Sequence, residues 1–240
     1  MALITSKGIV FKTVKYSESS IICDIFTEAL GLRSFIISAS KSSRTKTNLI
    51  QVMNILDLVF YENDADKIHR IKECHLHYFY HHLQTNILKS SIGTFMMEIC
   101  RNTIKEQEEN EALFDFLYHW FTTLDAWEGK LAFYHIKFLL DLSNFGGFSP
   151  HNNYSTEHSI FELESGDFIS ESNHSPFALD APISLLLNQV LSANLEQLNN
   201  LSASLHDRNQ LLDALIRYYQ IHVPGFKAVK SLDILRVVIE

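Results

Sequence analysis

The chain has 240 residues, 46% hydrophobic and 20% charged, a globular composition that supplies enough apolar surface for a core and excludes a mainly disordered protein. Its formal net charge is −8, from 20 Lys and Arg against 28 Asp and Glu, and by itself this disfavours a polyanionic partner. The start shows no secretory signal pattern, and no apolar run reaches the roughly 18 residues of a membrane helix. We therefore expect a cytoplasmic protein without a membrane partner.

The charge is distributed unevenly along the sequence. Residues 1–80 hold 10 basic and 8 acidic residues, whereas residues 81–240 hold 10 and 20. Residues 31–50 contain four basic residues and no acidic one. Because charges farther apart than about 8 Å are largely screened at physiological salt, this local positive charge can attract a polyanion despite the net charge.

Five segments of the first 80 residues are rich in Ile, Val and Phe and are separated by turn residues, which predicts five strands. Ala29-Leu30-Gly31 forms a predicted tight turn, and residues 62–66 form a predicted acidic hairpin loop. This spacing favours an oligonucleotide-binding (OB) barrel domain over residues 1–80, in which a longer connection between the third and fourth strands carries the basic residues. The predicted strands are 7–16, 20–27, 32–39, 52–60 and 67–73.

The segment from Ser38 to Thr47 mixes cations with hydroxyl groups and therefore suits phosphate oxygens: lysine offers a point charge, arginine a bidentate fork, and Ser and Thr short neutral donors. A solvated loop without a partner is the alternative. The predicted DNA-binding residues are Arg33, Lys41, Arg44 and Lys46, with Lys12 and Lys15.

Aromatic residues of the same region could stack on bases, although we expect most of them in the core. Alternation directs Phe35 and Phe60 inward and leaves Tyr16, at a strand end, as a candidate for the surface. The aromatic residues are Phe11, Tyr16, Phe26, Phe35, Phe60 and Tyr61.

After Cys74 the hydrophobic period changes from two to 3.6, which predicts a mainly α-helical domain over residues 81–240 and an α+β protein overall. Apolar stripes predict helices over 113–124 and 131–142, and later ones over 182–193, 207–222 and from Lys227. The glycine pair Gly146-Gly147, followed by Pro150, ends the second of these helices. A polar insert at about 150–176 contains a predicted β-hairpin that turns at Ser165-Gly166.

A histidine cluster next to Cys74 raises the possibility of a zinc site and of a metal-dependent hydrolase. Neither HExxH spacing nor a fixed carboxylate accompanies it. The alternative is that these histidines mark a strand-to-helix junction and the polar face of a tyrosine-rich helix. The cluster comprises His69, His75, His77, His81 and His82.

Other catalytic signals are missing: the sequence contains no GxxxxGK[ST], GxGxxG, GxSxG or HExxH motif. The three cysteines, Cys23, Cys74 and Cys100, have no CxxC spacing, which argues against a disulfide framework and a cysteine zinc site. We expect a protein that is not an enzyme and has no cofactor.

Several segments, in order along the chain, resemble the RecO family of recombination mediators. The basic run after Ala39 is similar to the lysine- and arginine-rich segment of that family. The segments that carry the resemblance are Gly8–Lys12, Glu18–Ile22, Phe26–Leu32, Phe138–Pro150, Phe226-Lys227 and Lys230–Leu232. Many members carry a four-cysteine zinc finger after the junction at Pro150, and residues 150–176 contain no cysteine, which puts structural zinc in doubt here.

The resemblance implies binding of single- and double-stranded DNA, annealing of complementary strands and assistance to a recombinase on DNA coated by single-strand DNA-binding protein. It implies two protein partners, RecR and the C-terminal tail of single-strand DNA-binding protein, and a place at the bacterial nucleoid. A protein-interaction scaffold that does not bind DNA is a further alternative.

Overall fold

The computed structural model describes residues 2–17, 20–38, 48–63, 67–105, 107–171, 173 and 175–239. Contacts divide the chain into two compact units, Met1–Ala126 and Trp127–Glu240. The first unit contains a barrel and two helices, and the second contains four α-helices and a small sheet among the described residues. The expected domain division after residue 80 stays a prediction.

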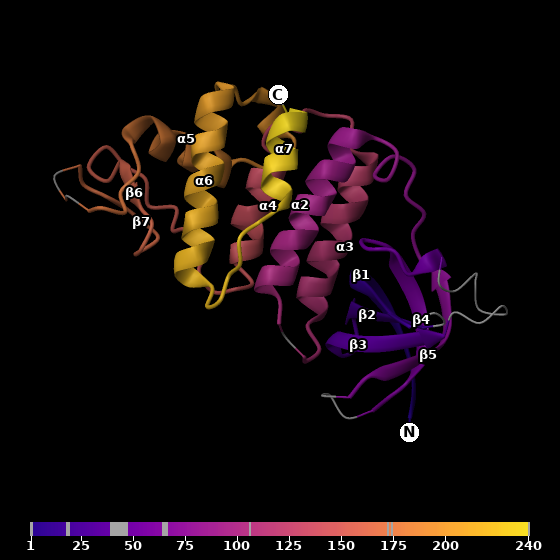
Figure 1. Ribbon diagram of the computed structural model, residues 1–240. Coiled ribbons are helices and arrows are strands. Elements are labelled where there is room, and N and C mark those ends of the chain that lie inside the picture. Colours follow the sequence, from indigo (N-terminus) through magenta and orange to yellow (C-terminus); the bar gives the residue numbers. More distant parts are fainter. Residues whose placement is uncertain are drawn as a thin grey trace. The chain divides into compact units, whose positions relative to one another are not determined.

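The first unit begins with five strands that close into a barrel in the order β1-β2-β3-β5-β4 (Figure 1). All neighbours are antiparallel except β3 and β5, which run parallel. This is the barrel topology and the α+β class that the sequence predicts. The strands are β1 Leu3–Ser17, β2 Ser20–Thr27, β3 Gly31–Ser38, β4 Ile55–Tyr61 and β5 His69–Leu76.

Strand β1 closes the barrel because it pairs with two neighbours. Its first half pairs with β4 and its second half with β2, and a register shift lies between Val10 and Lys12. Between β2 and β3, Gly31 has φ +69°, and the Thr27 hydroxyl donates to the Gly31 carbonyl at 2.8 Å. The predicted tight turn is therefore confirmed, and only glycine adopts this φ without strain.

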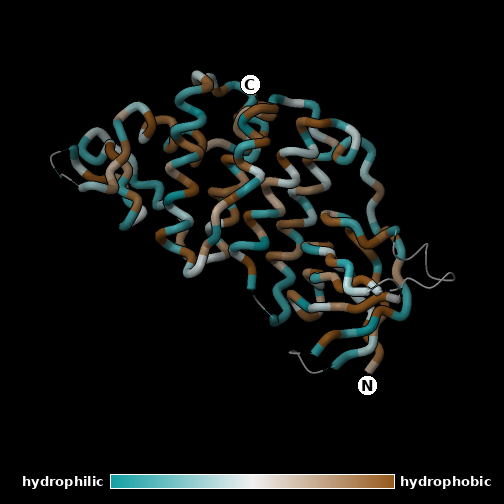
Figure 2. The backbone as a smooth tube through the Cα atoms, in the orientation of Figure 1, coloured by the Kyte–Doolittle hydropathy of each residue, from teal (hydrophilic) through white to brown (hydrophobic). Residues whose placement is uncertain are grey.

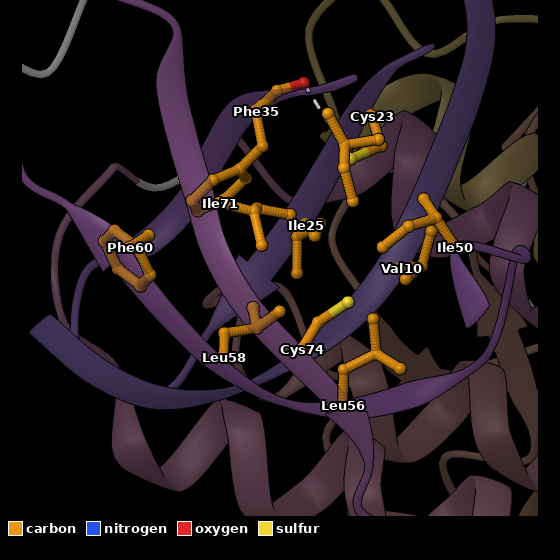
Figure 3. Packing of buried hydrophobic residues seen from close by; sticks show 11 residues of the cluster. Val10, Cys23, Ile25, Phe35, Ile50, Leu56, Leu58, Phe60, Ile71 and Cys74 are labelled. Atoms are coloured by element: carbon orange, nitrogen blue, oxygen red, sulfur yellow. Dashed lines mark hydrogen bonds between the residues drawn. The ribbon is translucent and has the colours of Figure 1, made fainter. Parts of the chain in front are cut away.

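The barrel interior is filled by alternating side chains from all five strands, which point toward one another (Figure 3). Phe35 and Phe60 are both fully buried and pack edge to face, with ring centroids 5.0 Å apart, so their predicted inward orientation is confirmed. Cys23 and Cys74 form no disulfide and are buried in this core. Burial raises the pKa of the Cys23 thiol to about 12, which leaves it unreactive at neutral pH.

Helices α2 Ile87–Thr103 and α3 Glu111–Ala126 complete the first unit. The predicted apolar stripe of α3 is buried at Leu113, Leu117 and Leu124, and apolar residues recur along the helices in Figure 2. The ring of Phe114 on α3 stacks at 6.4 Å on Phe26 of the barrel, so α3 packs against the outer wall of β2.

The expected tyrosine-rich helix over the histidine cluster is wrong. Residues 77–86 form bends, turns and irregular backbone, and α2 begins only at Ile87. The side chain of Asn86 accepts hydrogen bonds from the N–H groups of Leu88 and Lys89 and so caps the helix there.

In the second unit, α4 Tyr134–Ser143, α5 Ala181–Ser192, α6 Leu205–His222 and α7 Ser231–Ile239 are the α-helices among the described residues. The predicted hairpin is confirmed as β6 Ile160–Glu162 and β7 Asp167–Ile169, with Gly166 at φ +74°. None of the helices that the structure describes is long and apolar enough to cross a lipid bilayer.

The hairpin insert is held by hydrogen bonds and packed rings. The buried Glu162 carboxylate accepts hydrogen bonds from the Ser165 N–H at 2.6 Å and the Ser175 hydroxyl at 2.8 Å. The Asn153 side chain exchanges two hydrogen bonds with the backbone of Phe168. A structural zinc site needs four closely spaced ligands, and the described residues of the insert do not fit one.

Candidate nucleic-acid interface

A row of residues runs around the outside of the barrel, each paired in register with the next. Alternation directs these side chains outward: Ile22 precedes the core residue Cys23, Ile36 follows Phe35 and Tyr61 follows Phe60, and residues paired in register share a face. We call this row the outer band. It consists of Val14, Ile22, Ile36, Arg70, Tyr61 and Leu3.

The outer band exposes apolar and aromatic surface. Val14 is 47% exposed, and Tyr16, two residues farther along β1, is 67% exposed. Leu3 and Tyr61 are also exposed, whereas Ile22 and Ile36 are half-buried. Tyr16 is thus confirmed as a surface residue.

Two cations lie on or next to the outer band. Arg70 is within the band and exposed, and Lys12 lies two residues from Val14 on the same face of β1. In the row of Lys12, Asp24 accepts a hydrogen bond from the Ser34 hydroxyl at 2.7 Å. Lys15 is exposed near the end of the β1–β2 ladder, where it pairs with Ile21. The structure therefore brings Lys12 to the side of the barrel that carries Val14 and Tyr16, whereas Lys15 alternates with these residues along β1.

Arg33 differs from the other predicted contacts, because it is only 8% exposed. One guanidinium nitrogen donates to the Leu32 carbonyl at 3.0 Å, and the side chain lines a polar cleft of about 330 Å³ with Lys67 and Gln107. Nearby, burial and, less strongly, the positive charge of Arg33 lower the pKa of His69. Arg33 offers little surface to a phosphate, and its contact with DNA stays a prediction.

The predicted contacts Lys41, Arg44 and Lys46 lie outside the described residues. Their segment follows Ser38, which pairs with Ser20, and Ser20 pairs with Ser17. These pairs place Ser38 at the end of the barrel where Lys15 and Tyr16 lie.

Two residues of the band were missed as site residues by the sequence analysis. Arg70, the charged residue of the band, was not predicted at all. Tyr61 was considered only as one of several aromatic residues. Both could have been found by alternation, since each is next to a residue of the barrel interior, Ile71 or Phe60.

The histidine cluster does not converge on one point. His69 is buried between Phe35 and Phe60, and its Nδ1 lies 2.9 Å from the Lys67 carbonyl. Within the described ranges, no group of three or more His, Cys, Asp or Glu residues is arranged to hold a metal ion.

Comparison with known proteins gives full-length similarity. Residues 1–80 match the family model described as "Recombination protein O N terminal", and residues 84–233 match "Recombination protein O C terminal". A DNA repair protein RecO of Flavobacterium psychrophilum is 32% identical over 241 residues, which cover 98% of both chains. The proteins of the same name from Christiangramia forsetii and Phocaeicola vulgatus are 30% and 31% identical, over 97% and 95% of this chain and 98% and 96% of their own.

Proposed function

Because the chain belongs to the RecO family of DNA repair proteins, we propose that it is a non-enzymatic recombination mediator that binds and anneals DNA strands. In this role it binds single- and double-stranded DNA and assists recombinase loading on DNA coated by single-strand DNA-binding protein. Its protein partners are a RecR-type mediator and the C-terminal tail of single-strand DNA-binding protein, and it acts at the nucleoid in the bacterial cytoplasm.

The observation that carries the proposal is the outer band. It crosses β2 and β3, the face on which OB barrels bind oligonucleotides, and the connections 18–19 and 62–68 flank it in sequence. Exposed Tyr16 and Tyr61 offer rings on which unpaired bases stack, while Lys12 and Arg70 offer charges for phosphates. Bases must be unstacked to reach such rings, so this face suits a single strand.

The basic segment follows Ser38, the last residue of β3, in the sequence. Lys41 and Arg44 lie in the acid-free window of residues 31–50, and phosphate contacts from this segment serve either form of DNA. The two alternatives have less support: the described histidines do not form a metal site, and a scaffold needs no exposed cations beside exposed tyrosines.

The test is fluorescence anisotropy of a labelled oligonucleotide at several salt concentrations. We expect Lys41→Ala with Arg44→Ala to weaken binding and to reduce the log-log salt slope by about 0.7 per lost contact on single strands. The matched control is Lys130→Ala with Lys227→Ala in the second unit. If the barrel variant retains the wild-type affinity and slope, the assignment of this segment is wrong.

A further inference from the structure

The connection between β5 and α2, residues 77–86, exposes an aromatic side chain on a backbone that is held in place. We call it the Phe79 loop. It contains no helix or strand, yet one buried carboxylate from α3 accepts hydrogen bonds from three consecutive backbone N–H groups of the loop. A loop fixed in this way has already lost most of its conformational freedom before any partner binds.

The carboxylate belongs to Asp125, in the last turn of α3. It accepts from the N–H groups of His81, His82 and Leu83 at 3.0, 2.7 and 2.6 Å. Burial acts to raise the pKa of Asp125, but the hydrogen bonds outweigh it and the pKa is lowered. The group is therefore ionised at neutral pH, when its acceptor strength is greatest.

Hydroxyl groups fix the residues on both sides of Phe79. The Tyr80 hydroxyl donates to the Met53 carbonyl at 3.0 Å, and the Tyr78 hydroxyl donates to Asp125 at 3.3 Å. Tyr80 is buried, whereas Phe79 between the two tyrosines is 68% exposed. The loop thus presents the Phe79 ring outward while its neighbours are tied to the unit.

Other exposed groups surround this ring. His81 packs edge to face on Phe79 with centroids 5.5 Å apart, and the His82 ring lies 6.4 Å from that of His81. The His82 carbonyl accepts from the Asn86 N–H at 2.8 Å, which closes a turn, and Ile87, 74% exposed, follows directly. Aromatic and apolar side chains on a rigid support are typical of the core of a protein–protein interface.

Nucleic acid is a poor fit for this surface. The sequence contains no Lys or Arg between Lys72 and Lys89. Of the two flanking lysines, Lys72 has its Nζ 3.7 Å from the Oε1 of Glu73. Lys89 is buried, and its ammonium group donates to the backbone carbonyl of Asp125 at 2.6 Å. Phosphates would therefore find no exposed lysine or arginine on the loop, although such contacts dominate nucleic-acid affinity.

We propose that the Phe79 loop is the surface on which the second mediator protein docks, with Phe79 and Ile87 entering an uncharged apolar pocket. The uncharged pocket follows from charge complementarity, because residues 74–88 contain no Lys, Arg, Asp or Glu. This inference rests on the proposed function for the existence of a RecR-type partner, and it assigns that partner a surface distinct from the outer band.

The experiment measures binding of the purified RecR-type protein of the same organism by calorimetry, in parallel with oligonucleotide anisotropy. We expect Phe79→Ala and Ile87→Ser each to weaken partner binding at least tenfold and to leave oligonucleotide affinity unchanged. Phe145→Ala is the matched control, because Phe145 is the other phenylalanine among the large hydrophobic residues described as exposed, and it should bind the partner normally.

The outcomes separate the two levels of the proposal. If Phe79→Ala and Ile87→Ser bind the partner as wild type does, the docking surface is wrong and the proposed function stands. If they weaken oligonucleotide binding instead, the loop contacts DNA and the docking surface is again wrong. If wild type binds the DNA but not the partner protein, the partner in the proposed function and this docking surface both fail.

Discussion

The outer band and the Phe79 loop both expose aromatic and aliphatic side chains on the first unit, but they differ in charge and in backbone support. The band lies on paired strands, includes Arg70 and lies next to Lys12. The loop has irregular backbone held by Asp125 and contains neither Lys nor Arg.

This difference shows that aromatic exposure alone does not identify a partner class. Stacking on bases adds affinity, but most nucleic-acid affinity comes from phosphates and weakens with salt. A surface with cations among its aromatic residues fits DNA, and a rigid aromatic surface without lysine or arginine fits a protein pocket. The two surfaces should therefore respond differently to mutation and to salt.

The largest expected effect concerns the support of the loop. Asp125→Ala leaves three backbone N–H groups of the loop without their acceptor and should cost about 3 kcal/mol of unfolding free energy or more. Denaturant unfolding measures the loss, and hydrogen exchange should show faster exchange at residues 81–83. Asp115→Ala, at an exposed position of the same helix, is the control. Equal losses in the two variants would contradict the role of Asp125.

The stability that the Asp125 carboxylate contributes depends on pH in the acidic range. Folding lowers the pKa of Asp125. The ionised carboxylate therefore contributes fully to the free energy of unfolding above the pKa of the unfolded chain, about 3.9, and this contribution is lost as the pH falls through the lower pKa of the folded protein. Asp125→Ala should lose less stability than wild type over that acidic range.

A smaller effect is expected on the band. Tyr16→Ala should weaken single-strand binding by about 1–3 kcal/mol through lost stacking, without changing the salt slope. Tyr16→Phe retains the ring and should bind as wild type does. Anisotropy measures both variants, and an alanine variant with wild-type affinity would remove Tyr16 from the interface.

The sequence predicts those parts of the barrel that depend on local alternation. Strand β2 has the predicted bounds, 20–27, and the buried Cys23 and Ile25 alternate with the half-buried Asp24 in its middle. Strand β1 begins at Leu3 rather than Lys7, because its first residues are ordered by pairing with β4, far away in sequence. Strand β4 begins at Ile55 rather than Val52, because Met53, at φ +76°, turns back to bond Val10.

In the candidate site, too, the features that depend on local alternation were predicted and those that depend on distant contacts were not. Lys12, Lys15 and Tyr16 are at the surface because alternation and the strand end place them there. Arg33 is buried where residues distant in sequence, Lys67 and Gln107, line the same cleft. The hydrogen bonds from the loop to Asp125 likewise join residues more than 40 positions apart. Local sequence patterns predict neither of these contacts.

The central claim, that charge separates a DNA-binding band from a protein-binding loop, is tested most directly by the salt dependence of single-strand binding in two variants. Lys12→Ala with Arg70→Ala should reduce the log-log slope by about 1.4, or about 0.7 per lost phosphate contact, whereas Phe79→Ala should leave the slope unchanged. A wild-type slope in the double variant, or a reduced slope in Phe79→Ala, would contradict the claim.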